Sequence, residues 1–274
     1  MGPTDTDRLL ARLVDALAVR VVVESVQGSG PREAGAWMAV CADAIIASIG
    51  GGNLEFDAIA HARRLLAGEA LELRRRVALG PSLGQCCGGV VHLRFERLSS
   101  ADGERLRSEQ RQAERSLMPV ALFGGGHVGR ALVQLLAALP VRVHWIDSRD
   151  EIFPADLPEC VQCEHSDPVQ AAVPTLAAGS RVLVMSFSHA EDLDIVAACL
   201  MRTRERGDLP FIGLIGSKSK WAAFRHRLEA RGFTADELAH VTSPIGVAGV
   251  AGKEPAVIAL AVAAQLMQQR AAAP

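Results

Sequence analysis

The stretch Val120–Gly129, VALFGGGHVG, decides the fold, because an apolar segment runs directly into a glycine-rich turn. Val120–Phe123 has the length of a short buried strand, and apolar residues at helical spacing follow from His127 to Leu139. Gly124–Gly129 fits the pattern G-x-G-x-x-G, and Asp147 lies at the end of the next predicted strand. A strand, a glycine turn, a helix and a later acid form the context that the dinucleotide-binding fingerprint requires.

Each glycine of that pattern has a physical role. Gly124 allows the tight turn, Gly126 lets a pyrophosphate approach the backbone, and Gly129 lets the helix pack closely on the strand. The N–H groups at the helix N-terminus then face an anion. Asp147 would bind a ribose hydroxyl or an equivalent diol, and Arg149 would accommodate an additional phosphate. The alternative is a Rossmann scaffold that holds no nucleotide, since fold does not imply function.

Strands and helices continue to alternate after this turn. Further strands are predicted at Val141–Ile146, Val182–Ser186 and Phe211–Ile215, and the apolar segment Ala256–Met267 predicts a buried helix. Such alternation indicates parallel strands joined by right-handed crossovers. We therefore predict a Rossmann-like, doubly wound parallel-sheet domain over residues 119–274.

The first part of the chain predicts a separate α/β domain over residues 1–98. An amphipathic helix comes first, since apolar residues from Leu9 to Leu17 share one face. The other predicted elements are strands at Arg20–Val26, Ala36–Val40, Ala44–Ile49, Leu71–Ala78 and Val90–Phe95, and a helix at Leu54–Leu66. The polar, charged segment 99–118 is predicted to link the two domains.

Composition limits the classes of protein to consider. The chain has 274 residues, of which 49% are hydrophobic and 22% charged, so it can form sizeable cores. A net charge of −2 without a basic run argues against binding to nucleic acid or to an anionic membrane. No segment has the pattern of a membrane span or a signal peptide. The six cysteines do not form a disulfide framework, so we expect a cytoplasmic protein.

Two glycine loops of the first domain have the composition of anion sites. Gly28–Arg32 offers flexible backbone, a hydroxyl and the Arg32 guanidinium, which suits a bidentate anion contact. Gly51 and Gly52 belong to a glycine run before a helix N-terminus, which is also suited to an anion. A plain tight turn is the alternative for this run.

A third loop, Gly84–Gly89, contains the adjacent thiols Cys86 and Cys87. Flanking glycines favour exposed, reactive thiols, which suit a soft metal or a transferable sulfur. The alternative is two small buried residues. In the second domain His189 follows a strand end, where open α/β sheets bind ligands. Cys160 and Cys163 have C-x-x-C spacing, but a second pair to complete a zinc site is lacking.

Taken together, these segments resemble the xanthine dehydrogenase accessory proteins, the molybdenum-cofactor chaperones of the xanthine dehydrogenase and aerobic carbon monoxide dehydrogenase systems. The resemblance covers nearly the whole chain. Each segment is short, but their order and spacing are specific. In chain order they are Gly28–Arg32 with Gly35 and Met38, Gly50–Glu55, Gln85–Gly89, Gly124–Gly129, Asp147–Arg149, Gly213–Ser217, Ser243–Gly246 and Gly252–Pro255.

The resemblance implies a protein that binds molybdenum cofactor, protects its sulfurated form and delivers it to apo-xanthine dehydrogenase, while a cysteine desulfurase supplies the sulfur. It implies a maturation chaperone rather than an enzyme, and we expect a homo-oligomer. Cys86 or Cys87 would contact the molybdenum. The chain departs from the family at Ser186–His189, where a threonine-histidine often precedes a second histidine. The expected cofactor-binding residues are Arg32, Gly51, Gly52, Cys86, Cys87, Gly124, Gly126, Gly129, Asp147 and His189.

Two other functions are compatible with the sequence. An NAD(P)-dependent oxidoreductase would use the same glycine turn and Asp147. A structural adaptor would dock two partners without any ligand. The absence of an acid–base pair at fixed spacing in the sequence favours a carrier over an enzyme.

Overall fold

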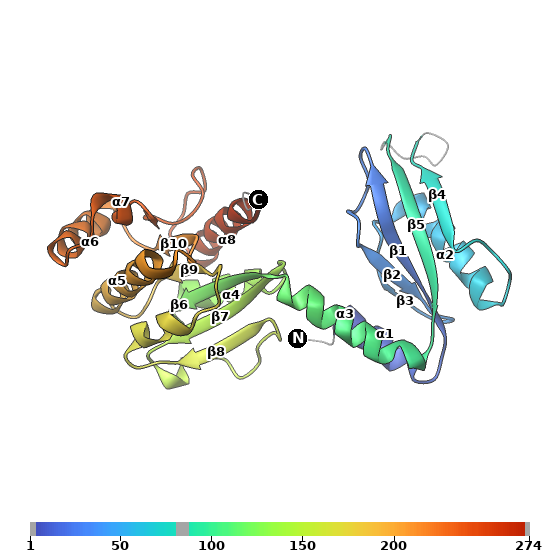
Figure 1. Ribbon diagram of the computed structural model, residues 1–274, viewed down its shortest axis with the longest axis horizontal. Helices are drawn as coiled ribbons and strands as arrows, with labels where there is room; N and C mark the ends of the chain where they lie inside the picture. The colour runs from blue at the N-terminus through green and yellow to red at the C-terminus, as the bar shows by residue number, and fades with distance from the viewer. Residues whose placement is uncertain (1–3, 81–87, 272–274) are drawn as a thin grey trace. The chain divides into compact units, whose positions relative to one another are not determined.

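A computed structural model describes residues 4–80 and 88–271 of the chain. The chain divides into two compact units, and the division falls between Arg115 and Ser116. In the described part of the chain, the helices are all too short or too polar to cross a bilayer. Figure 1 shows both units, and each is described by itself below.

The first unit is built on a five-stranded antiparallel sheet with the order β3-β2-β1-β5-β4. Its strands are β1 (Ala18–Gln27), β2 (Trp37–Val40), β3 (Ile45–Ala47), β4 (Arg74–Ala78) and β5 (Val90–Leu98). Alternate residues of β1, such as Val19 and Val21, pack against helix α2 (Gly52–Leu66), whose buried residues include Leu54 and Leu65. Helix α1 (Asp5–Leu13) contributes Leu9 to a second apolar cluster. The expected α/β architecture of this unit is confirmed.

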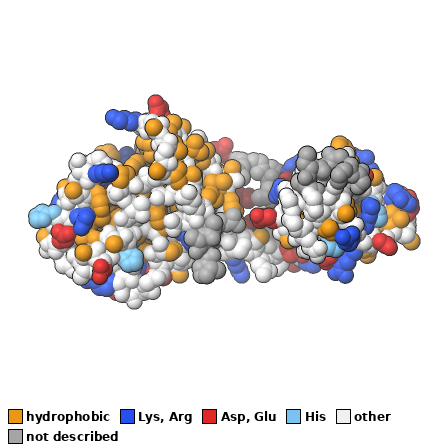
Figure 2. Space-filling model, turned by 90° about the horizontal axis from the view of Figure 1, so that it is seen from above, with side chains coloured by type: hydrophobic (Ala, Val, Ile, Leu, Met, Phe, Trp, Pro, Cys, Tyr) orange, Lys and Arg blue, Asp and Glu red, His pale blue; other side chains and the backbone are white. Residues whose placement is uncertain are grey.

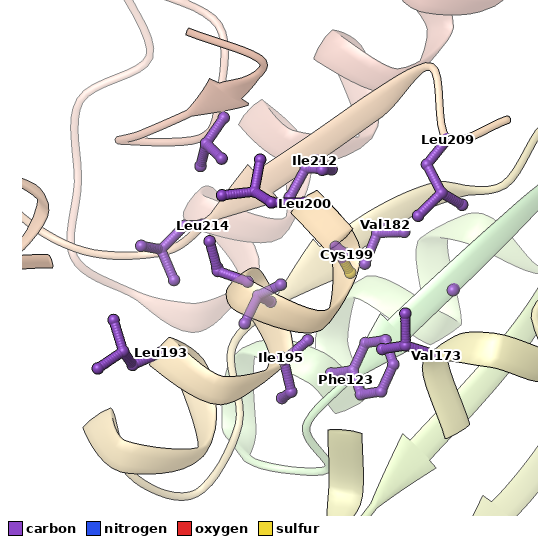
Figure 3. Packing of buried hydrophobic residues seen from close by; sticks show 14 of the residues in the cluster. Phe123, Val173, Val182, Leu193, Ile195, Cys199, Leu200, Leu209, Ile212 and Leu214 are labelled. Atoms are coloured by element: carbon purple, nitrogen blue, oxygen red, sulfur yellow. The ribbon is translucent and has the colours of Figure 1, made fainter. Parts of the chain in front are cut away.

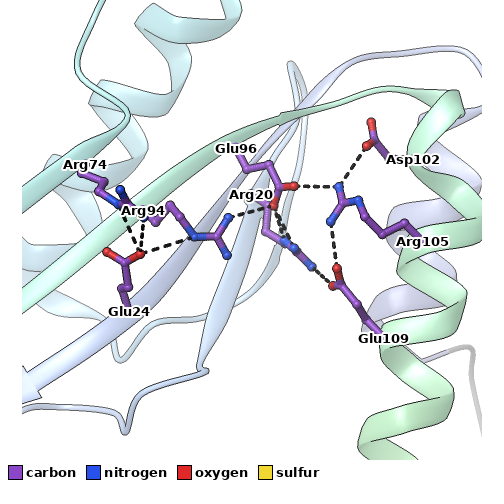
Figure 4. Close-up of polar contacts among 8 residues, drawn as sticks. All are labelled: Arg20, Glu24, Arg74, Arg94, Glu96, Asp102, Arg105 and Glu109. Atoms are coloured by element: carbon purple, nitrogen blue, oxygen red, sulfur yellow. Dashed lines mark hydrogen bonds and ion pairs between the residues drawn. The ribbon is translucent and has the colours of Figure 1, made fainter.

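The segment expected to be a linker contains a 3-10 turn, η2 (Ser100–Asp102), and helix α3 (Gly103–Arg115), both within the first unit. Leu106 of α3 is buried in the cluster that includes α1. Figure 4 shows how charged side chains attach α3 to the sheet: Arg20 of β1 donates to Glu96 of β5 at 2.8 Å and to Glu109 of α3 at 2.6 Å. The charges that suggested a linker are therefore largely paired on a packed helix.

The second unit is a six-stranded, fully parallel sheet with the order β11-β10-β9-β6-β7-β8. Its strands are β6 (Met118–Phe123), β7 (Val141–Asp147), β8 (Val161–His165), β9 (Arg181–Val184), β10 (Phe211–Leu214) and β11 (Val241–Thr242). The predicted doubly wound Rossmann-like domain is confirmed. Strand β8 was not predicted, because its sequence VQCEH is an edge strand with few apolar residues.

Helices cover both faces of this sheet (Figure 1). They are α4 (His127–Leu136), α5 (His189–Arg206), α6 (Lys218–Ala230), α7 (Ala235–Leu238) and α8 (Pro255–Ala271), with 3-10 turns η3 (Asp150–Ile152) and η4 (Val169–Thr175). Because side chains alternate along β6, Val120 and Leu122 pack with α4 and α8, whereas Ala121 and Phe123 face the cluster that includes α5. Figure 3 shows the α5 side of this core.

Charged side chains of both signs are interspersed with hydrophobic ones on the face of the second unit that Figure 2 shows. This agrees with the net charge of −2 and with the absence of a basic run in the sequence. On this face, therefore, charge alone does not mark a candidate site.

Candidate functional site

The glycine turn lies where the strand order of the parallel sheet reverses. Strand β6 pairs with β7 on one side and with β9 on the other, so the turn Gly124–Gly129 lies beside the loop that follows β9. Ligands of open α/β sheets bind at such a switch point, beyond the carboxyl ends of the strands. Gly124 has a φ of +120°, and a Cβ on it would lie 2.0 Å from the Met185 carbonyl oxygen. The backbones of the two loops therefore lie too close together for a side chain at position 124.

The glycines of this turn have different surroundings. A Cβ on Gly129 would lie 2.1 Å from the Gly124 carbonyl oxygen, so the helix and the turn pack backbone to backbone, as expected. Gly126 is exposed, and a Cβ on it would meet no atom within 4 Å. The fold thus requires glycine at 124 and 129, whereas at 126 the space above the backbone is open.

Helix α4 begins without a cap of its own. Its N-cap is Gly126, no side chain caps it there, and its first turn carries no acidic residue. By contrast, the hydroxyls of Ser188 and Ser217 accept from N–H groups of α5 and α6 at 3.2 Å each. The first N–H groups of a helix lack intrahelical acceptors and carry its positive dipole end, so the start of α4 is suited to an external anion.

The Asp147 side chain forms hydrogen bonds with the glycine turn itself and with Arg149. Its side chain is 1% exposed and accepts from the Gly125 N–H at 2.6 Å and from the Arg149 N–H, Nε and Nη2 at 2.8–2.9 Å. Burial acts to raise the pKa of the Asp147 carboxyl, but the hydrogen bonds from Arg149 and Gly125 outweigh it and lower that pKa. The carboxylate therefore holds the turn in shape, and contact with a ligand hydroxyl remains a prediction.

Two guanidinium groups flank the turn. Arg130 donates to the carbonyl oxygens of Gly125 at 3.3 Å and Ile152 at 2.8 Å, while Arg149 is held by Asp147. On the inner side, the Trp145 indole donates to the Gly124 carbonyl oxygen at 2.9 Å. The turn is thus fixed from both sides, with two cations beside it.

The loop after β9 is held by a buried ion pair that the sequence analysis missed. Asp192 accepts from the Ser186 N–H and hydroxyl at 2.8 and 2.7 Å and from the Lys220 ammonium at 2.5 Å. Lys220 and Asp192 are 11% and 3% exposed. In the structure Gly216 has a φ of +152°, and its missing Cβ makes room for the Lys220 stem. His189 is exposed at the start of α5, edge-on to Phe224.

The loops of the first unit that were predicted separately lie together. A Cβ on Gly89 would lie 2.3 Å from the Ser29 carbonyl oxygen, and a Cβ on Gly50 would lie 2.6 Å from the Pro31 side chain. Arg32 is exposed beside Gly50, and no hydrogen bond or ion pair joins it to the residues described here. Cys86 and Cys87 lie outside the described residues, in the segment that leads into Gly88 and Gly89.

The Gly50–Gly52 run differs from the second unit's turn because an internal carboxylate faces it. Glu55 accepts from the Ile49 and Gly51 N–H groups at 2.9 and 3.2 Å and from the Ser48 hydroxyl at 2.6 Å. Burial acts to raise the pKa of the Glu55 carboxyl, and these hydrogen bonds outweigh it and lower that pKa. The N–H group of Gly51 that was expected to meet an external anion therefore donates to Glu55.

Soft-metal ligands do not gather in the described part of the chain. No group of three or more His, Cys, Asp or Glu side chains there is arranged to hold a metal ion. Cys160 and Cys163 pack against the α4–α8 core, and burial raises the pKa of both thiols. That environment suits packing more than redox chemistry.

Comparisons with known proteins agree with this architecture. One family model, described as the XdhC Rossmann domain, matches residues 120–266, and another, described as the XdhC and CoxI family, matches residues 15–76. The uncharacterized protein YqeB of Escherichia coli (strain K12) is 27% identical over 262 residues, which cover 94% of this chain. The matched region covers 44% of YqeB, so the chain spans less than half the length of that relative.

A solved structure shares the fold of nearly the whole chain. It is that of a protein from Bacillus halodurans described as a xanthine dehydrogenase. The TM-score is 0.76, with 99% of this chain and 97% of that one covered at 19% sequence identity. At this identity the likeness establishes the shared fold.

Proposed function

Because the chain belongs to the XdhC family, we propose that it binds molybdenum cofactor, protects the sulfurated form and delivers it to apo-xanthine dehydrogenase. Membership of this family supports a role in the maturation of xanthine dehydrogenase. In this proposal a cysteine desulfurase supplies the sulfur while the cofactor is held, and the working form is a homo-oligomer.

The observation that carries the proposal is the uncapped start of α4 at the switch point. Molybdenum cofactor is a pterin that carries a phosphate, and a phosphate suits the N–H groups of a helix N-terminus. Gly126 leaves the approach open, and the guanidinium groups of Arg130 and Arg149 add positive charge nearby. Arg32, Gly51 and Gly52 of the first unit, together with Cys86 and Cys87, remain proposed contacts.

A holding function fits the acidic groups near the turn better than a turnover reaction does. A general base needs a carboxylate that can accept a substrate proton. Asp147 and Asp192 are instead engaged with Arg149 and Lys220 inside the protein. These side chains support a cradle that holds a ligand without themselves taking part in its chemistry.

Reconstitution of an apo-molybdenum hydroxylase under limiting sulfurated cofactor tests the proposal. With this protein present, we expect more active client per mole of cofactor and no change in the turnover of client that is already loaded. Equal activation with and without the protein would reject delivery.

NAD(P)-dependent oxidation is the second candidate, favoured by the G-x-G-x-x-G turn. Its ribose contact would have to compete with Arg149 for Asp147. The test is whether this chain reduces or oxidises a small substrate with NAD(P). A turnover on the order of 1–1000 per second would establish the oxidoreductase function in place of delivery.

A further inference from the structure

An exposed aromatic residue directly follows Ser186, whose backbone approaches the glycine turn at Gly124. Phe187, in the loop after β9, is 67% exposed. Single exposed apolar side chains are common on proteins, so exposure alone carries no argument. What distinguishes Phe187 is how firmly it is held: the Arg149 guanidinium lies 4.6 Å from its ring centroid, and its N–H donates to Glu191 at 3.2 Å.

The contact between Arg149 and Phe187 is fixed on both sides. Arg149 is anchored by its hydrogen bonds to Asp147, whose Oδ2 also accepts from the Gly125 N–H at 2.6 Å. The Phe187 loop is anchored through Glu191, which also accepts from the Ser148 hydroxyl at 2.7 Å. A continuous set of contacts therefore runs from the glycine turn through Asp147 and Arg149 to the Phe187 ring.

Phe187 offers a flat apolar face at the carboxyl end of the sheet, where open α/β sheets bind ligands. A phenyl ring cannot ligate a metal or transfer a proton, but it can stack on a flat heterocycle. An ordered ring with much of its surface in solvent presents such a face at little entropic cost on binding.

We propose that Phe187, backed by Arg149, is the wall on which the heterocyclic ring of a phosphate-bearing ligand stacks, while the start of α4 holds the phosphate. The ligand class is a flat nitrogen heterocycle joined to a phosphate, which includes both pterin phosphates and nucleotides. The inference rests on the proposed function for the location of the ligand, and it adds a contact that selects for the ring.

Calorimetric titration of the full chain with three probes tests the wall. Pyrophosphate offers phosphate alone, ADP adds a heterocycle, and isolated molybdenum cofactor offers the pterin. For Phe187→Ala we expect about tenfold weaker binding of ADP and molybdenum cofactor, within the range of ~5–150-fold for lost ring stacking. Pyrophosphate binding should change less than about twofold, and Phe187→Trp should keep the wild-type affinity for ring-bearing probes.

Phe56→Ala is the matched control, because Phe56 of α2 is 70% exposed, as much as Phe187, and belongs to the other unit. It should leave the affinity for all three probes unchanged. The proposal is overturned if Phe187→Ala weakens pyrophosphate as much as ADP, if it leaves the ring-bearing probes unaffected, or if neither of those probes binds the wild type.

The same titrations separate this inference from the proposed function. If ADP binds through Phe187 and molybdenum cofactor does not bind, the wall stands and the chaperone proposal fails. If molybdenum cofactor binds equally to wild type and to Phe187→Ala, the wall is rejected and the chaperone proposal stands.

Discussion

Two glycine turns of this chain look alike in sequence and differ in what faces them. Gly50–Gly52 and Gly124–Gly126 each follow a strand and open a helix, α2 and α4. In the first, Glu55 from the opening turn of α2 accepts the N–H groups of Ile49 and Gly51. In the second, Asp147 accepts only from Gly125 among the glycines. Both helices have a glycine N-cap that no side chain caps, but the first turn of α4, unlike that of α2, carries no acidic residue.

The difference indicates that a glycine run before a helix does not by itself suffice for an anion site. The Glu55 carboxylate already accepts N–H groups of the turn before α2, and its negative charge disfavours a second anion there. We therefore assign the external anion to the turn that opens α4. The predictions below test this assignment from the largest expected effect on stability to the smallest.

Gly124→Ala should have the largest effect. The new Cβ would lie 2.0 Å from the Met185 carbonyl oxygen, and the φ of +120° is strained for any side chain. We expect the second unit to lose about 4 kcal/mol or more of unfolding free energy, which urea denaturation measures. A loss below about 1 kcal/mol would contradict the close approach of the two loops.

Asp147→Asn should cost less, about 3 kcal/mol, because both carboxylate oxygens accept hydrogen bonds and the amide NH2 of Asn would face one of these donors. The folded pKa of Asp147 lies below its unfolded value near 3.8, so its stabilisation is present above that pH and is lost as pH falls through the folded pKa. The stability difference between wild type and variant should therefore shrink below about pH 4. A difference that stays constant down to pH 2 would contradict this role.

Glu55→Gln should cost about 2 kcal/mol, because an amide oxygen is a weaker acceptor for the Ser48, Ile49 and Gly51 donors than a carboxylate is. The folded pKa of Glu55 is also lowered, here from 4.5, so this stabilisation too is lost on acidification. Pyrophosphate affinity of the chain should not change. A change in pyrophosphate affinity in this variant, and a gain above all, would mean that the first turn also serves as an anion site.

Sequence reasoning succeeded where local pattern determines structure. The strand, turn and helix around Gly124–Gly129 and the parallel sheet followed from short-range signals. The hydrogen-bond partners of the two glycine turns did not follow from such signals. Glu55 was known only as part of a family segment, and the pairing of Arg149 with Asp147 competes with the ribose contact expected for that carboxylate.

The elements that sequence reasoning missed depend on contacts across the fold. Strand β8 forms because β7 offers it an edge, although its own sequence is polar. Lys220 reaches Asp192 from another helix, and a buried lysine carries no mark in sequence that separates it from an exposed one. Such pairings follow from topology, which a single sequence encodes only indirectly.

Gly126→Val should have the smallest effect on stability. A Cβ there meets no atom within 4 Å, and the φ of −70° and ψ of −172° suit a branched residue. We expect a change in unfolding free energy of about 0.5 kcal/mol or less. A larger loss would mean that this glycine supports the fold, as Gly124 and Gly129 do.

The most direct test of the central claim is the affinity of molybdenum cofactor for wild type and for Gly126→Val, measured by titration beside Glu55→Gln. If the start of α4 holds the phosphate, the valine side chain occupies the ligand's path, and affinity should fall by about a hundredfold or more at nearly unchanged stability. Glu55→Gln should bind as the wild type does. Equal affinity of wild type and Gly126→Val for molybdenum cofactor would contradict the account.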